Sequence, residues 1–128
     1  MLGNYQCRTV QLLGLFLLVG FSVAAPVAYA NCADAESAAD DAYTYARRAF
    51  GESNFADAQR YMRRARNAAD DAKSAAEDCR CDDAESAAGD AYTYARRGYN
   101  ASNLRELRAY ARRTMRAAEV AKDAADSC

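Results

Sequence analysis

The chain has 128 residues, with 17 lysines and arginines against 18 aspartates and glutamates, and no histidine. This length predicts one domain or two very small ones, and the lack of histidine removes the usual general base, haem ligand and zinc ligand. No glycine-rich phosphate-binding loop is present either, so we expect no enzyme, no cofactor and no small-molecule substrate.

The first thirty residues differ in composition from the rest of the chain. Arg8 is their only charged residue, an apolar run extends from Leu12 to Val27, and the segment ends in Ala-Tyr-Ala. A charged start, an apolar stretch and small residues at positions −3 and −1 are typical of a secretory signal peptide. We therefore predict a signal peptide over residues 1–30, cut after Ala30.

Two other interpretations of this segment are less favoured. A membrane anchor would need an apolar run of about 20 residues, and the run is shorter. A lipoprotein signal needs a small residue where Asn31 precedes Cys32. The sequence therefore predicts a protein that is secreted or periplasmic and carries no lipid anchor.

Four cysteines remain after the predicted cleavage, at positions Cys32, Cys79, Cys81 and Cys128. An even number of cysteines in a small exported domain predicts two disulfides. A reduced four-cysteine metal site is the alternative, but the usual pairs with two residues between the ligands are missing. Oxidised cysteines also make a thiolate nucleophile unexpected.

The cysteines bracket a tandem repeat. Residues 32–79 and 81–128 are both 48 residues long and align without gaps at an offset of 49, with more than half of the positions identical. The segment Glu36–Arg48, for example, recurs as Glu85–Arg97 with one change. Only Arg80 separates the copies, so we predict two repeats of one structural unit, over residues 31–79 and 80–128.

Each copy is predicted to form two helices, because alanine is the best helix former and Arg, Glu and Lys follow closely. The first helix is expected from about Asp34 to Phe50, and the second after the stop at 51–54, ending near Asp78. In the second copy the last helix is expected to end near Ser127. Asn54 and Asn103, each followed by an acidic third residue, are predicted N-caps.

Alanines recur in every predicted helix at alternating spacings of three and four, which is the pattern of a coiled coil. Such a seam lets two helices approach closely, but it buries little apolar area. The cysteines lie in phase with the seams, and small exported domains commonly need such covalent links. The predicted fold is all-α: two tandem, alanine-rich, antiparallel helical hairpins linked by disulfides, forming a small four-helix bundle or two loosely joined hairpins.

The favoured disulfides are Cys32–Cys79 and Cys81–Cys128, each closing a loop worth about 4 kcal/mol in the chain-entropy model. One observation does not fit this pairing. A turn centred near Ser53 would place Cys32 level with Lys73, six residues short of Cys79. Pairing across the two copies therefore remains an alternative.

The charges are unevenly distributed along each hairpin. Residues 43–66 and 92–116, near the turns, have net charges of +4 and +6, whereas the remaining residues near the cysteines sum to −7 and −6 in the two copies. A field of one sign at one end attracts partners of opposite charge, although the pattern is also compatible with a solvated surface. The candidate anion- or partner-binding residues are Arg47, Arg48, Arg60, Arg63, Arg64, Arg96, Arg97, Arg108, Arg112 and Arg113.

Tyrosines lie beside the seams and alternate with arginine in Tyr-Thr-Tyr-Ala-Arg-Arg. We interpret their rings as a cover over the thin alanine seam, with a stacking surface for a ligand as the alternative. Four aspartates near the cysteine ends, at positions 40, 41, 70 and 71, could gather and hold Ca²⁺. No calcium-loop spacing supports such a site, so no metal ligand is predicted.

Two short resemblances concern packing and do not identify a family. Residues Asn54–Arg66 resemble the second helix of a tetratricopeptide repeat, with Ala58 and Ala65 at its small positions, but the second copy departs from this motif and the 49-residue period does not fit. The alanine heptads are similar to the alanine zippers of bacterial envelope lipoproteins, whose lipid-attachment signal is missing here.

Two hypotheses of function follow from these features. The leading hypothesis is an exported, non-enzymatic structural or protein-interaction module, whose basic tips could contact acidic ends of other molecules of the same chain. The alternative is an anion-binding protein that contacts lipopolysaccharide, anionic lipid or nucleic acid through its arginine-rich tips.

Overall fold

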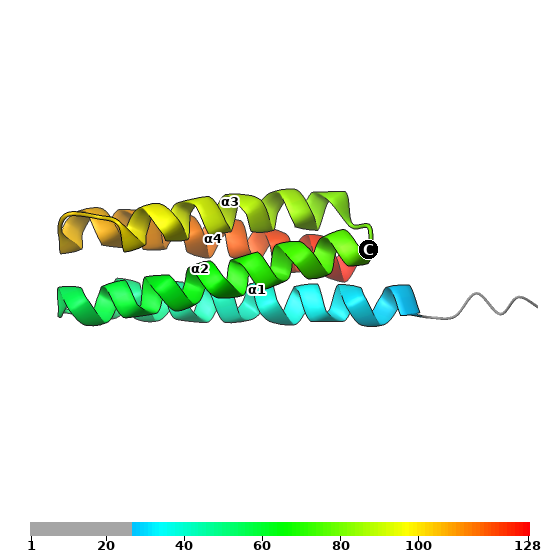
Figure 1. Ribbon diagram of the computed structural model, residues 1–128, viewed down its shortest axis with the longest axis horizontal. Helices are drawn as coiled ribbons and strands as arrows, with labels where there is room; N and C mark the ends of the chain where they lie inside the picture. Colours follow the sequence, from blue (N-terminus) through cyan, green and yellow to red (C-terminus); the bar gives the residue numbers. More distant parts are fainter. Residues whose placement is uncertain (1–26) are drawn as a thin grey trace, which may run out of the picture.

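A computed structural model describes residues 27–128, with side chains from Cys32 onward. This part of the chain forms four α-helices and no strand: α1 (Val27–Gly51), α2 (Phe55–Asp78), α3 (Asp82–Tyr99) and α4 (Leu104–Ser127) (Figure 1). The apolar run of the predicted signal peptide lies outside the described residues, apart from its last residue. None of the described helices is long and apolar enough to cross a membrane.

The helix ends agree with the sequence at the caps and differ at the start of α1. Asn54 Oδ1 accepts a hydrogen bond from the Asp57 amide at 3.0 Å, and Asn103 Oδ1 accepts one from the Glu106 amide at 2.9 Å, as predicted. The start of α1 was predicted wrongly, because the helix begins seven residues before Asp34. Residues 27–33 include three alanines and no helix-breaking residue, so the helix continues through the predicted cleavage site.

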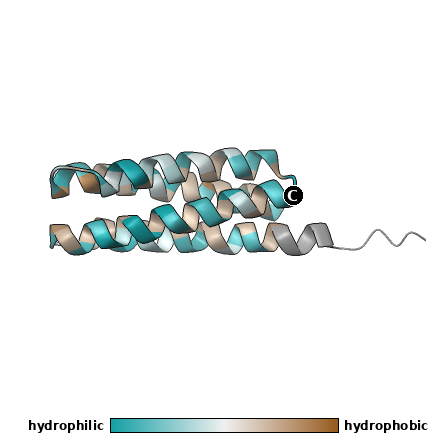
Figure 2. Cartoon of the chain, viewed as in Figure 1, coloured by the Kyte–Doolittle hydropathy of each residue, from teal (hydrophilic) through white to brown (hydrophobic). Residues whose placement is uncertain are grey.

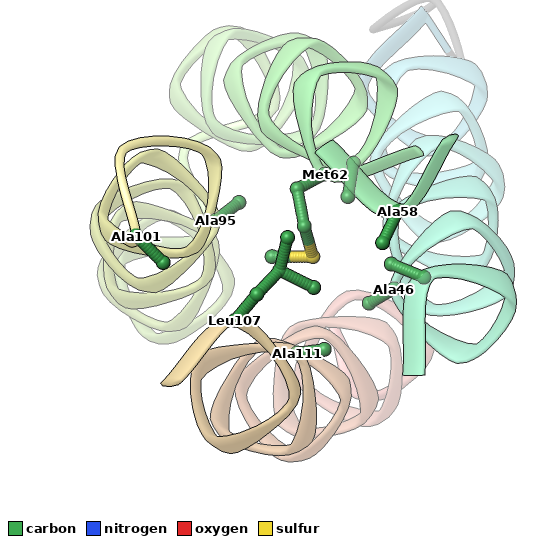
Figure 3. Close-up of a cluster of buried hydrophobic side chains, with 9 residues drawn as sticks. Ala46, Ala58, Met62, Ala95, Ala101, Leu107 and Ala111 are labelled. Carbon is green, nitrogen blue, oxygen red and sulfur yellow. The ribbon is translucent and has the colours of Figure 1, made fainter. Parts of the chain in front are cut away.

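The four helices pack as a square bundle with up-down-up-down topology. Each helix contacts two neighbours along its length, and the diagonal pairs barely touch (Figures 1 and 3). Helices α1 and α4, from opposite ends of the described chain, are neighbours. Because single core clusters contain residues of all four helices, such as Ala39, Ala72, Ala88 and Ala121, the predicted four-helix bundle is confirmed and the loosely joined hairpins are not observed.

The register of each hairpin explains how the cysteines meet. Three pairs of alanines from α1 and α2 share core clusters: Ala35 with Ala76, Ala39 with Ala72, and Ala42 with Ala69. In each pair the two residue numbers add to the same value, so moving forward along α1 and equally far backward along α2 reaches residues at the same height in the bundle. The next step in this series pairs positions 32 and 79. The expected level of Cys32 beside Lys73 was therefore wrong.

The turn, rather than a bend at the helix ends, sets this offset. Residues 52–54 leave the helical conformation, and Asn54 is extended with φ −91° and ψ 122°. Extended residues advance about 3.3 Å each against 1.5 Å in a helix. A short extended segment can therefore carry the start of α2 beyond the end of α1.

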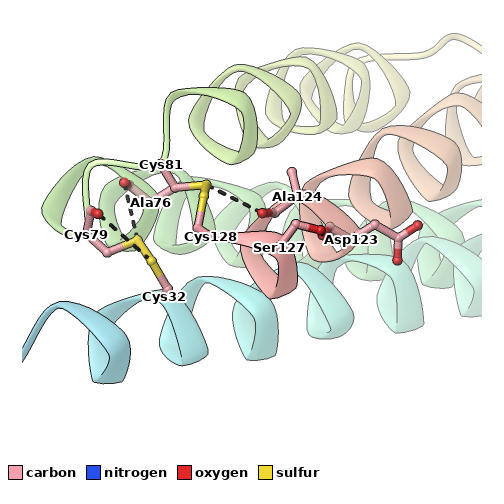
Figure 4. The surroundings of a disulfide bond; sticks show 8 residues. All are labelled: Cys32, Ala76, Cys79, Cys81, Asp123, Ala124, Ser127 and Cys128. Atoms are coloured by element: carbon pink, nitrogen blue, oxygen red, sulfur yellow. Dashed lines mark hydrogen bonds between the residues drawn. A yellow bond between two sulfur atoms is a disulfide. The ribbon is translucent and has the colours of Figure 1, made fainter. Parts of the chain in front are cut away.

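Both favoured disulfides are confirmed (Figure 4). The Cα atoms of Cys32 and Cys79 lie 5.4 Å apart, and those of Cys81 and Cys128 lie 6.1 Å apart, within the usual range for disulfides. Pairing across the copies and the four-cysteine metal site are both excluded by this connectivity. The two bonds lie at the same end of the bundle, which we call the cysteine end; the end with the two hairpin turns is the turn end.

A single residue, Arg80, carries the reversal between the two hairpins. Its φ of 58° lies in the left-handed region. The amide of Cys81 donates to the carbonyl of Ala76 at 2.9 Å, and the amide of Arg80 donates to that of Glu77 at 3.0 Å, which together form a Schellman motif. This motif returns the chain so that Cys81 and Ala76 share one core cluster.

The core changes in character along the bundle. At the cysteine end and in the middle it consists of alanines and cystines. At the turn end Met62 and Leu107, from the diagonal helices α2 and α4, fill the centre (Figure 3). In the alignment of the copies, Leu107 stands where the first copy has Ala58, and Met62 stands where the second has Ala111. Large side chains thus alternate with small ones at this end, and each helix carries both hydrophilic and apolar residues (Figure 2).

Candidate functional site: an arginine belt

The fold brings the basic tips of both hairpins to one end of the molecule. Each helix carries one Arg-Arg pair there, and each pair is adjacent in sequence to a residue of a single core cluster: Ala46, Ala65, Ala95 or Ala111. The four pairs therefore lie at nearly one level around the bundle. We call these eight residues the arginine belt: Arg47, Arg48, Arg63, Arg64, Arg96, Arg97, Arg112 and Arg113.

The belt is exposed, and no carboxylate of residues 32–128 forms an ion pair with it. All eight side chains are solvent-exposed. Among residues 32–128 only two ion pairs form, Arg60 with Asp57 at 3.3 Å and Lys122 with Asp40 at 2.8 Å, and neither includes a belt residue. The guanidinium groups of the belt therefore keep their charge available for an external anion.

Aromatic rings lie beneath several of these guanidinium groups. Between α1 and α2, Arg48 and Arg64 both lie 5.9 Å from the ring centroid of Tyr45. Between α3 and α4, Arg113 lies 6.0 Å from Tyr94 and 5.6 Å from Tyr110.

The α4–α1 side follows the same pattern, with Arg112 at 5.4 Å from Phe50. Stacking uses the face of a guanidinium and leaves the N–H groups at its edge free, at a gain of about 0.5–1 kcal/mol for an exposed pair. The rings thus hold the arginines against the bundle without occupying their donors.

Tyrosine rings also cover the core, as the sequence predicted. Tyr45, Tyr61 and Tyr99 are half-buried against the cluster at the turn end, while Tyr43 and Tyr92 pack against the alanines of the middle layer. Their apolar area compensates for the small side chains beneath them.

Two of the candidate arginines have other contacts. Arg60 is exposed but is paired with Asp57 one turn away. Arg108 is half-buried; one of its terminal amino groups donates to the carbonyl of Glu52 at 2.8 Å, and its Nε is buried without a partner. Arg108 thus links α4 to the turn of the other hairpin and lies outside the belt.

The belt as a unit was not predicted from the sequence, although every one of its members was a candidate. The repeat offset fixes the relation between equivalent pairs, such as Arg47-Arg48 and Arg96-Arg97. The levels of α1 and α2 depend on the turn register, which was predicted wrongly. Had the two cysteines been taken as level, the Arg-Arg pairs of the two helices would have matched as well.

The cysteine end is acidic and contains no arrangement suited to a metal ion in the described part of the chain. The four aspartates considered for Ca²⁺ do not form a ligand group. Asp40 instead accepts a hydrogen bond from Lys122 Nζ across the α1–α4 contact. This hydrogen bond and the charge of Asp40 raise the pKa of Lys122 above 10.5.

Comparisons with protein-family models, curated proteins and solved structures found no match to this chain. The candidate site therefore rests on geometry and charge: a rod with arginines around one end and carboxylates around the other.

Proposed function

We propose that this chain is a non-enzymatic interaction module of an oxidising compartment outside the cytoplasm, and that its arginine belt binds a flexible, phosphate-bearing polyanion. The observation that carries the proposal is the ring of four exposed Arg-Arg pairs at one level, none of which is paired with a carboxylate. The two disulfides support the oxidising compartment, and export through a signal peptide over residues 1–30 is part of the proposal.

Arginine chemistry favours phosphate as the recognised group. The planar guanidinium presents N–H donors in a fork that matches two phosphate oxygens, and it is less strongly hydrated than an ammonium group. Twelve arginines other than Arg108 lie at the turn end, whereas both lysines of residues 32–128 lie in the acidic half. The basic residues of the turn end are therefore all arginines, the residue type that binds phosphate with two parallel N–H donors.

The shape of the belt favours a flexible chain over a flat surface. The pairs point outward from all four helices of a rod, so a planar membrane lying against its side reaches at most two neighbouring helices. A flexible polyanion can bend around the rod and contact more pairs at once. Each phosphate contact releases counterions, so affinity grows with the number of contacts and falls with salt.

The proposal is tested with a labelled single-stranded oligonucleotide as the polyanion, titrated with the oxidised protein over a series of salt concentrations. We expect the logarithm of the binding constant to fall linearly with the logarithm of salt concentration, with a slope of about −0.7 for each phosphate contact. Vesicles containing phosphatidylglycerol serve as the flat anionic surface, and we expect weaker binding to them at equal phosphate concentration.

The decisive variant replaces Arg47, Arg48, Arg63 and Arg64 with alanine. Its matched control replaces four arginines outside the belt, Arg60, Arg66, Arg105 and Arg116, so that both variants lose the same charge. We expect the belt variant to bind the oligonucleotide at least roughly tenfold more weakly than the control, with a smaller salt slope.

Equal losses in the two variants would show that the overall charge of the turn end matters and the belt does not. Absence of oligonucleotide binding by the unaltered protein at low salt would refute the proposal. Tighter binding to the vesicles than to the oligonucleotide would replace the flexible polyanion by a membrane as the partner.

A further inference from the structure

The outer face of α3 and α4 differs from the equivalent face of α1 and α2, and it carries an exposed apolar residue that no side chain of residues 32–128 covers. Among residues 32–128, Phe50 and Val120 are the large apolar side chains that are exposed, at 37% and 59%. Phe50 has the guanidinium of Arg112 over its ring. Val120 instead lines two adjoining grooves on the α3–α4 face, of about 660 and 310 Å³.

The two grooves form one continuous surface, because Ala87, Asp90 and Val120 line both of them. Toward the cysteine end the surface carries Asp83 and Asp123. Toward the turn end it carries Arg113 and Arg116. None of these charged side chains has an opposite charge within 4.0 Å in the described chain. The surface is therefore acidic at one end and basic at the other, with Ala87, Val120 and the carboxylate of Asp90 between them.

We infer that this face pairs with the same face of a second copy, antiparallel, about a two-fold axis at Val120. A two-fold axis makes the contact reciprocal, so that each copy offers its basic half to the acidic half of the other. The two Val120 side chains contact each other at the axis and are both buried from solvent.

The spacing of the charges fits such an axis. In α4, Arg116 lies four residues before Val120 and Asp123 lies three residues after it, so the axis brings Arg116 of one copy opposite Asp123 of the other. Arg113 lies seven residues before Val120, roughly 10 Å along the helix. Asp83 precedes Ala84, which shares a cluster with Ala125, and therefore lies at a similar distance on the other side.

The first repeat provides an internal comparison. At the positions equivalent to Val120, Arg116 and Asp123 it has Asp71, Asn67 and Ser74. The second repeat thus has one central carboxylate, Asp90, where the first has two, Asp41 and Asp71, and it has one more charge of the required sign in each half. All three differences favour self-association through α3–α4 and disfavour it through α1–α2.

The available area is sufficient for a weak dimer. Helices of 18 and 24 residues offer a face of roughly 30 by 18 Å, which corresponds to roughly 1,100 Å² buried in total, close to the lower limit for a specific interface. This inference does not depend on polyanion binding, because the four belt arginines of α1 and α2 remain outside the interface.

The test is sedimentation velocity of the oxidised chain from micromolar to millimolar concentration. We expect reversible formation of a dimer that stops at twice the monomer mass, and weakening by salt, which screens the four charge contacts. The variant Val120→Asp adds one carboxylate from each copy to the Asp90 carboxylates near the axis and should weaken the dimer at least roughly tenfold. The matched control Asp71→Asn, at the equivalent position of the first repeat, should leave it unchanged.

A charge exchange tests the antiparallel register. Arg116→Glu alone should weaken the dimer, and Arg116→Glu combined with Asp123→Arg should restore it, because each altered residue then meets the other across the axis. Failure of the double variant to restore the dimer would refute this register. A monomer at millimolar concentration and low salt would overturn the inference. A mass that grows beyond that of the dimer with concentration would also overturn it, because head-to-tail contacts between basic and acidic ends build open chains.

Discussion

The two halves of the bundle are stabilised in different ways. At the turn end the core contains Met62 and Leu107, and tyrosine rings cover it from outside. At the cysteine end the described core consists of alanines and the two cystines. A buried alanine contributes one methyl group, whereas a buried leucine or methionine side chain contributes about 1.5–3 kcal/mol. Covalent links thus replace apolar burial in the half of the bundle whose core has the smallest side chains.

The largest expected effect comes from removing the disulfides. Replacing Cys32 and Cys79, or Cys81 and Cys128, with alanine should each lower the free energy of unfolding by about 4 kcal/mol, because a closed loop of this size limits the unfolded chain. Urea unfolding followed by circular dichroism measures the loss. Hydrogen exchange should also show that amides at the cysteine end open first. A reduced chain as stable as the oxidised one would contradict this account of the alanine seam.

Removing the large side chains of the turn end should have the next largest effect. Leu107→Ala and Met62→Ala should each lower the free energy of unfolding by about 2–5 kcal/mol, because both side chains are fully buried and leave a cavity. Met62→Leu, which conserves volume, should cost less than about 1.5 kcal/mol. If Met62→Ala lost less stability than Met62→Leu, the turn end would not be held by apolar packing.

Gly98 tests how closely the helices approach at the turn end. A Cβ atom there would lie 2.6 Å from Met62 Cε and 3.2 Å from Tyr110 Cβ, so Gly98→Ala should cost about 1–3 kcal/mol through overpacking. Gly89, on the same helix, has nothing within 4 Å of its Cβ position. Gly89→Ala should therefore stabilise the protein by up to about 1 kcal/mol, and thermal unfolding of the two variants should shift in opposite directions.

A substitution at Arg80, which links the two hairpins, should raise the free energy of unfolding slightly. Arg80 adopts a φ of 58°, which costs a residue with a side chain about 1–2 kcal/mol. Arg80→Gly removes this cost but also increases the conformational entropy of the unfolded chain. We therefore expect the free energy of unfolding to rise by about 0.5–1 kcal/mol. Arg80→Ala, which removes the same charge and keeps the Cβ, should show no gain. Chemical denaturation distinguishes the two variants.

The smallest effect concerns the contact between Lys122 and Asp40. The hydrogen bond and the charge of Asp40 raise the pKa of Lys122 above 10.5, so the protonated lysine binds its proton more tightly in the folded chain. The resulting stability is fully present below pH 10.5 and is lost as the pH rises through the folded-state pKa. Melting temperatures of the unaltered protein and of Asp40→Asn should therefore differ slightly at neutral pH and converge in strong alkali. A difference in melting temperature that persists in strong alkali would show that a contact other than that of Lys122 with Asp40 causes it.

Much of the fold could be predicted because its signals are local. The caps at Asn54 and Asn103 follow from a side chain and an amide three residues away. Helical periodicity also places each cysteine on the same face of its helix as the core alanines. The start of α1 was missed because no local signal stops the helix at Asp34, and the level of Cys32 was missed because it depends on the path of three loop residues.

The candidate site divides in the same way. The basic residues, their position near the turns and the repeat of the pattern in the two copies can all be read from the amino-acid sequence. The packing of the helices is needed to show that four Arg-Arg pairs share one level, that Arg108 contacts Glu52, and that no side chain of residues 32–128 covers Val120. Helix propensity and periodicity act over a few residues, whereas the relative height of two helices and the exposure of a side chain are set by turns and by packing between distant segments.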